Sequence, residues 1–167
     1  MIKAAAVLAL FAGAFTGFSA AKKLKTRETS LEKLLQFLLA LKLSLEYGGK
    51  PLGGLLRELE QREETKANSF PGMLTAELQN GAALPQAWKT ASLAEKGTIG
   101  SEGTALLLRL GALIGTTDKP GQSELLSSEL RRLDQLYQSA KEKRERCAPL
   151  YRAVGAFAGF AVFILAV

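Results

Sequence analysis

Both ends of the chain are apolar and uncharged, and this feature restricts the possible folds more than any other. The first run covers residues 4–21 and is 18 residues long, and the second covers residues 153–167. A helix needs roughly 20 apolar residues to span the hydrocarbon core of a bilayer, with about 17 as the lower limit. The second run reaches that limit when it is extended backwards, because Arg152 lies near the helix end and can reach the lipid headgroups. We therefore expect transmembrane helices over residues 1–21 and 150–167.

The first run also has features of a cleavable signal peptide. Lys3 would supply the positive n-region, and Ser19–Ala21 resembles a small-residue cleavage site. A signal h-region is usually about 7 to 15 residues long, and the basic cluster that follows this run opposes export. We therefore favour a retained membrane anchor, and a cleaved signal peptide is the alternative.

Two basic clusters border the apolar runs on their inner sides. They consist of Lys22, Lys23, Lys25 and Arg27 after the first run, and of Lys141, Lys143, Arg144 and Arg146 before the second. Basic residues near transmembrane ends stay on the cytoplasmic side of the membrane. Both clusters therefore place the middle part, residues 22–149, in the cytoplasm of a protein held in the cell membrane. The same clusters can attract anionic lipid headgroups, so membrane lipids are expected partners.

The composition of the middle part disfavours nucleic-acid binding and catalysis. Residues 28–140 carry 12 basic and 14 acidic side chains, a net charge of −2, so they have no basic excess to neutralise phosphates. The chain contains no histidine and one cysteine, Cys147, and therefore lacks the commonest general base and a set of zinc ligands. The Gly-Gly-Lys string at Gly48 does not have the spacing of a Walker phosphate loop. We expect no enzyme, no cofactor, no metal and no small-molecule substrate.

Leucines recur at helical spacing through the middle part. Steps of three and four residues from Leu31 to Leu45 indicate an amphipathic helix, which Thr29 or Ser30 can cap and Gly48–Gly49 can end. Similar stripes predict a helix after Pro51, two helices on either side of Asn80–Gly81, a helix over residues 102–114, and a long helix from about Gln122 to Cys147 with Pro149 as the joint to the last run. We expect an all-α bundle of about six helices, built of helical hairpins.

Two of these predicted turns resemble each other. GKPLGGLL from Gly49 and GAALPQAW from Gly81 share glycine at the first position, leucine at the fourth and an apolar pair at the seventh and eighth. The offset of 32 residues indicates either a repeated helix–glycine–helix hairpin or a chance similarity in a leucine-rich chain.

Glycines four residues apart occur in both end runs. The pairs are Gly13 with Gly17 and Gly155 with Gly159. This spacing lets two membrane helices approach closely, although small residues are also simply tolerated in lipid.

Three motifs of the middle part resemble those of one protein family. They are LSLEYGGKPL at residues 43–52, the pair Ala87-Trp88, and LGALIGTTDKPGQ at residues 110–122. The last is similar to a Leu-Gly-x-x-Leu-Gly-x-x-Asp-x-x-x-Gln motif of stage III sporulation protein AB, a membrane protein family of endospore-forming bacteria. Ile114 replaces the motif's second leucine, and residues 119–121 replace a more polar stretch. The resemblance covers nearly the whole chain.

The resemblance also implies a role. The family is similar to the helical cytoplasmic domains of the type II secretion F protein, through the Gly-x-x-Leu hairpins at Gly49 and Gly81. It implies a scaffold in a channel or secretion-like complex between mother cell and forespore, lodged in the mother-cell membrane around the forespore. The expected partners are a secretion-type ATPase, stage III sporulation protein AA, and other channel subunits. The alternatives are a membrane-tethered helical adaptor for another protein and, least favoured, a membrane enzyme.

The residues of interest have expected roles in structure or at an interface. Gly111 and Gly115 lie four apart, so the missing side chains leave room on one helix face, and Gly115 can alternatively end the helix. Asp118 can cap the next helix, and Gln122 falls near its first turn. A direct contact with a partner is the alternative for these four residues. The full set of candidates is Gly49, Gly81, Trp88, Gly111, Gly115, Asp118 and Gln122.

Overall fold

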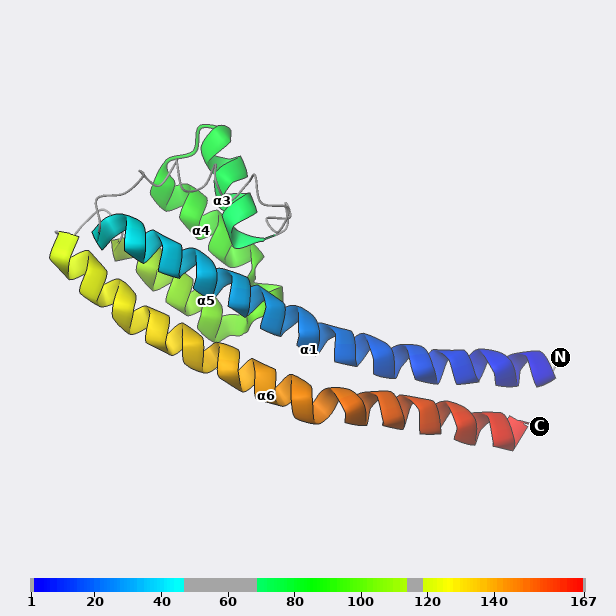
Figure 1. Cartoon of the computed structure of the whole chain (residues 1–167). Helices are drawn as coiled ribbons and strands as arrows, with labels where there is room; N and C mark the ends of the chain where they lie inside the picture. Colours follow the sequence, from blue (N-terminus) through cyan, green and yellow to red (C-terminus); the bar gives the residue numbers. More distant parts are fainter. Residues whose placement is uncertain (1, 47–68, 114–118, 167) are drawn as a thin grey trace. The chain divides into compact units, whose positions relative to one another are not determined.

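The computed structural model of the chain describes residues 2–46, 69–113 and 119–166 (Figure 1). Inside the helices, this description excludes the side chains of residues 2–14, 45, 113, 119–123, 125, 159, 162, 163, 165 and 166. The described residues form α1 (Ile2–Glu46), α3 (Phe70–Gln79), α4 (Leu84–Ala94), α5 (Lys96–Leu113) and α6 (Lys119–Ala166), with no strand among them. The all-α prediction is confirmed. The predicted helix after Pro51 lies outside the described residues, so the count of six helices is not confirmed.

The chain divides into two compact units. Unit 1 consists of Met1–Glu28 and Gln138–Val167, and unit 2 consists of Thr29–Tyr137. The long helices α1 and α6 contribute residues to both units. The domain boundaries at residues 21 and 149, which rest on hydropathy, stay a prediction.

The two long helices are more continuous than the sequence predicts. A separate helix capped by Thr29 or Ser30 was expected, and this prediction is wrong because α1 runs unbroken through both residues. A hydroxyl side chain is tolerated inside a helix when it bonds the carbonyl four residues earlier, as Thr26 Oγ1 does with the Lys22 carbonyl at 3.0 Å. The expected joint at Pro149 is also wrong, because α6 continues through it. Proline inside a helix removes one N–H donor and crowds the carbonyl four residues earlier, which strains or kinks a helix but does not always end it.

The start of α6 differs from the prediction by three residues. The helix begins at Lys119, whereas the sequence pattern places its start near Gln122. Pro120 falls in the first turn, where its fixed φ favours a helix and its missing N–H is not needed. Gln122 therefore lies within α6, and its side chain is outside the description.

The α3–α4 hairpin follows the predicted signals. Both helices carry a proline in the first turn. The C-cap of α3 is Asn80, and Gly81 follows with a φ of 85°, the left-handed conformation that favours glycine. The Gly81 N–H bonds the Leu78 carbonyl at 3.1 Å, and the Ala82 N–H bonds the Glu77 carbonyl at 3.0 Å. These two bonds form a Schellman motif, which ends the helix at the predicted position.

The helix α5 contains a break that the sequence pattern did not predict. Gly100 has φ 83° and ψ 175°, a combination that is essentially restricted to glycine. Before it, the Glu95 carbonyl accepts the N–H groups of Thr98 and Ile99 at 2.9 and 3.0 Å. The regular part of α5 therefore starts after Gly100, close to the predicted start at residue 102.

The core of unit 2 is built on the predicted leucine stripes. Its buried apolar residues are Leu31, Leu34, Phe37, Leu38 and Leu41 of α1, Phe70 and Leu74 of α3, Ala87, Trp88 and Ala91 of α4, Ile99, Leu106, Leu107 and Leu110 of α5, and Leu126, Leu130 and Leu133 of α6. Every described helix thus turns an apolar face inward. Such burial is the main favourable term in folding.

Candidate functional site

Trp88 is the largest fully buried side chain of unit 2. It is 1% exposed, and its ring centroid lies 4.9 Å from that of Phe70 and 6.3 Å from that of Phe37. Phe37 and Phe70 contact each other edge to face at 5.7 Å. Three helices, α1, α3 and α4, therefore meet in one aromatic cluster. Pairs of this kind contribute about 0.5–1.5 kcal/mol beyond the burial of their area.

The indole of Trp88 also joins α4 to α5. Its Nε1 donates a hydrogen bond of 2.7 Å to the Leu107 carbonyl oxygen, in the interior of α5. Gly111 lies four residues later on the same helix, and a Cβ there would come within 2.7 Å of Trp88 Nε1 and 2.8 Å of Cγ. The missing side chain at Gly111 is therefore what lets the ring approach the α5 backbone closely enough to bond it.

Glu95 lies at the C-terminal end of α4, and its side chain caps the N-terminal end of another helix, α3. This residue is the C-cap of α4, it is buried, and its side chain accepts a hydrogen bond from the backbone N–H of Phe70, the first residue of α3. The Ser69 side chain does not cap that helix end. Glu95 thus satisfies an N–H group that would otherwise be unpaired, and its negative charge lies at the positive end of the α3 dipole.

The surroundings of Glu95 change its acidity. Burial raises the pKa of its carboxyl above the ordinary 4.5, and the bond from Phe70 opposes this rise. A cavity of about 20 Å³ lies beside it, lined also by Ser30 and Lys33 of α1. A cavity of this size has room for about one water molecule.

Replacing Glu95 by glutamine should flatten the pH dependence of the stability of unit 2. In the folded chain Glu95 holds a proton more readily than in the unfolded chain. The free energy of unfolding therefore falls as the pH rises from 4.5 through the raised pKa. Glutamine cannot ionise but keeps an oxygen acceptor for Phe70, so this loss of stability should disappear.

Urea unfolding between pH 4.5 and about pH 7 measures how steeply the free energy of unfolding changes with pH. Glu102→Gln, at an exposed position of α5, is the matched control. An unchanged slope in both variants would contradict the role of Glu95.

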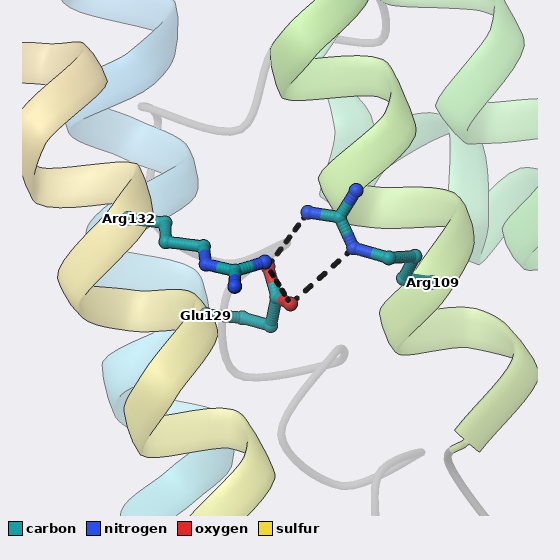
Figure 2. A network of polar contacts seen from close by, with 3 residues as sticks. All are labelled: Arg109, Glu129 and Arg132. Carbon is teal, nitrogen blue, oxygen red and sulfur yellow. Dashed lines mark hydrogen bonds and ion pairs between the residues drawn. The ribbon is translucent and has the colours of Figure 1, made fainter.

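A second polar contact joins α5 to α6 in unit 2. Arg109 donates from Nε and Nη2 to the two carboxylate oxygens of Glu129, at 3.3 and 3.0 Å, and Arg132 Nη1 donates to the same carboxylate at 3.2 Å. Figure 2 shows both guanidinium groups converging on the Glu129 carboxylate, one from each helix. The Glu129 side chain is only 6% exposed, so it needs partners to be stable in this position.

Unit 1 is a pair of antiparallel helix segments with small residues between them. The first part of α1 and the last part of α6 lie side by side and end at the same end of the unit (Figure 1). A Cβ on Gly17 would lie 3.0 Å from Gly155 Cα and would also contact the Tyr151 carbonyl oxygen. Gly17 and Gly155 thus lie where the two helix segments approach each other closely. Gly13 and Gly159 lie within α1 and α6, and their surroundings are outside the description.

Further contacts set the register of this pair. The Arg152 guanidinium lies 5.9 Å from the centre of the Phe18 ring, and Arg144 Nε lies 2.7 Å from a carboxylate oxygen of Glu28. Residues 18 and 152, and 28 and 144, are therefore level with each other. This register brings the two basic clusters of the sequence together on the same section of unit 1.

The large apolar side chains of unit 1 face outward. Its buried described residues are Ala21, Glu28, Ala140 and Gly155. Its exposed large apolar residues are Phe15, Phe18, Leu150, Tyr151, Val154, Phe157, Phe160 and Ile164, with exposures from 42% to 76%. An exposed apolar patch of this extent marks a surface that contacts a membrane or another protein.

Within the part of the chain that the structure describes, no helix is long and apolar enough to cross a membrane. Most of the first predicted run falls on residues 2–14, whose side chains lie outside the description, and the two transmembrane helices stay a prediction. No group of three or more His, Cys, Asp or Glu side chains that could hold a metal ion occurs among the described residues.

Residues 3–167 match the family described as stage III sporulation protein AB (spore_III_AB). The chain belongs to this family. Membership implies a role in sporulation and interaction with other sporulation proteins. No curated protein and no solved structure gives a significant match to the chain.

Two of the motifs that resemble this sporulation family meet in the structure. Trp88 comes from the Ala-Trp pair and Gly111 from the Leu-Gly motif, and they are in direct contact across α4 and α5. The other candidates are placed as follows. Gly81 lies in the α3–α4 turn, Gln122 lies within α6, and Gly49, Gly115 and Asp118 lie outside the described residues.

Sequence reasoning did not single out the charged residues of these contacts. Glu95, Arg109 and Glu129 have no neighbouring pattern that distinguishes them from solvated charges. The only available signal is position, since Glu129 falls beside Leu130 and Leu126 on a face of α6 that is otherwise buried.

Proposed function

We propose that this chain is a membrane-anchored scaffold of a secretion-like sporulation complex. Both end segments of unit 1 are transmembrane helices in the mother-cell membrane around the forespore, and unit 2 lies in the cytoplasm. Unit 2 docks a secretion-type ATPase, stage III sporulation protein AA, and the membrane helices contact other channel subunits. The observation that carries the proposal is the packing of unit 1, whose buried described residues are small apart from Glu28 and whose exposed residues include large apolar side chains.

That packing is the pattern of membrane helices. A helix pair in water buries its large apolar side chains, because removing them from water is the driving force. In a bilayer the lipid tails are as apolar as leucine, so helices associate through small residues that allow close backbone contact. The contact of Gly17 with Gly155, and the exposure of Phe157 and Ile164 at 76% and 72%, follow the second pattern.

The charges of unit 1 support the orientation. The eight basic residues of the two clusters lie on one section of the pair, and along the sequence each cluster lies on the inner side of the outward-facing phenylalanines of its own segment. Basic residues at this depth remain on the cytoplasmic side and attract anionic headgroups. Tyr151 and Arg152 lie next to this section, where aromatic and long basic side chains suit the membrane interface.

The role of unit 2 follows from the sporulation family and from the likeness of its hairpins to secretion F proteins. A small helical body with a net charge of −2 over residues 28–140 suits protein docking better than nucleic-acid binding. The ATPase partner comes from the resemblance alone.

Purification from sporulating cells tests the partner. The full-length chain, tagged and solubilised from membranes in mild detergent, should co-purify with the secretion-type ATPase. An unrelated tagged membrane protein of similar abundance is the control for non-specific capture. Capture of a single partner that is not an ATPase would instead favour the membrane-tethered adaptor.

A further inference from the structure

The contact of Arg109, Glu129 and Arg132 contains two positive charges and one negative charge. Arg109 alone makes a two-bond pair with Glu129, the strongest geometry for a guanidinium and a carboxylate. Arg132 adds a second positive charge to the same group, from three residues along α6. The Arg132 side chain is 62% exposed, so solvent weakens its attraction to Glu129 even though the carboxylate is buried. The pair with Arg109 already neutralises the carboxylate, and Arg132 therefore leaves one positive charge without a partner charge in this contact.

The two arginines remain accessible while the carboxylate is sheltered. The side chains of Arg109 and Arg132 are 48% and 62% exposed, against 6% for Glu129. A guanidinium carries five N–H donors, so the bonds to Glu129 do not exhaust the capacity of either arginine. Glu129 thus holds two guanidinium groups at one place on the surface, with one positive charge in excess (Figure 2).

Two residues of α5 on the same face as Arg109, one on either side of it, are small and exposed. Ala105 and Ala112 lie four residues before and three residues after it, which places them on the same face of α5, and both are exposed. Side chains this small allow a partner's backbone to come close to the guanidinium groups. Arginines surrounded by such contacts often dominate the binding energy of protein interfaces.

We propose that Arg109 and Arg132 bind a carboxylate side chain of the partner protein that docks on unit 2. This inference rests on the proposed function, in which that partner is the secretion-type ATPase. An acidic protein side chain fits better than an anionic lipid surface, because residues 28–140 carry a net charge of −2 and are repelled by such a surface as a whole. Because the two arginines form a positive site on a unit with a net negative charge, they determine the position at which an acidic side chain of the partner binds.

Two single substitutions on α6 test the proposal, and each removes one positive charge from the chain. Arg132→Gln removes one of the two guanidinium groups and leaves the two bonds of Arg109 with Glu129 in place. Arg131→Gln is the matched control, because Arg131 is exposed and lines a shallow groove with Leu35 and Leu39 of α1 rather than contacting Glu129. The full-length variants in detergent micelles are titrated with the purified ATPase. Arg132→Gln should weaken binding about tenfold, and Arg131→Gln less than about twofold, with the melting temperature unchanged in both.

The outcomes separate this inference from the proposed function. If the wild type binds the ATPase and both variants bind as well as it does, only the carboxylate site is wrong. If the wild type does not bind, the proposed docking of the ATPase is wrong and this site loses its partner. A melting temperature that falls together with binding in Arg132→Gln would reveal a structural role and contradict the proposal. Weaker binding of this variant to phosphatidylglycerol vesicles, with ATPase binding intact, would also contradict it.

Discussion

Replacing Trp88 by alanine should destabilise unit 2 by about 3–5 kcal/mol, the range for truncating a buried tryptophan. The variant loses the ring contacts with Phe37 and Phe70 and leaves the Leu107 carbonyl without its indole donor. This loss is a large part of the total stability of a small domain. Urea unfolding of the full-length chain in detergent, followed by circular dichroism, measures it, since the only tryptophan of the chain is removed.

A milder variant separates the two contributions of this residue. Trp88→Phe keeps most of the aromatic contact but cannot donate to Leu107, so it should cost less than the alanine variant. Lys89→Ala, at an exposed position next to it, is the control and should change the free energy of unfolding by no more than about 0.5 kcal/mol. A loss below about 1 kcal/mol for Trp88→Ala would show that the ring does not organise the core.

Placing a side chain at Gly111 should destabilise unit 2 by about 1–3 kcal/mol for alanine, and by at least as much for leucine. The Cβ alone would come within 2.7 Å of Trp88 Nε1, and the ring is too buried to move away freely. The matched control is Gly97→Ala on the same helix, because a Cβ at Gly97 has nothing within 4 Å. Its effect should stay within about 0.5 kcal/mol. In wild type and variants, the fluorescence of the single tryptophan also reports whether the ring is displaced.

A double-mutant cycle tests whether the two residues act through their contact. In a chain that already carries Trp88→Ala, the change Gly111→Ala should cost almost nothing, because the ring that it would clash with is absent. Equal costs of Gly111→Ala with and without the ring would contradict the close approach. A Gly111 variant of normal stability that fails only to bind a partner would instead identify a docking glycine.

The helices of unit 2 could be predicted because several local signals agree. The leucine stripe from Leu31 to Leu41, the proline in the first turn of α4, and Asn80-Gly81 each indicate a helix face, a start or an end. The continuity of α1 through Thr29 and Ser30 and the break at Gly100 in α5 were harder to predict. Thr29 and Ser30 can cap a helix or be tolerated within one, and packing decides between the two. Gly100 is one of several glycines in its segment, and nothing local distinguishes the one with a positive φ.

The candidate site could be predicted only in part, because its contacts join residues far apart in the sequence. Gly111 and Trp88 were identified separately, but their contact depends on how α4 and α5 pack. The pair of Arg109 and Glu129 spans 20 residues, and Glu95 caps a helix that precedes it in the chain. Charge patterns within one helix therefore carry no information on these partners. For unit 1, in contrast, the glycine spacing and the basic clusters are visible in the sequence itself.

Labelling of one introduced cysteine in membrane vesicles tests the central claim, a membrane-anchored body on the cytoplasmic side. The native Cys147 is first replaced by serine, and Lys89→Cys then places a thiol at an exposed position of α4. Vesicles are washed with alkaline carbonate and treated with a membrane-impermeant maleimide. The account predicts that the chain stays in the membrane fraction and reacts in inside-out vesicles but not in right-side-out ones. Release of the chain by carbonate, or reaction in right-side-out vesicles, would contradict it.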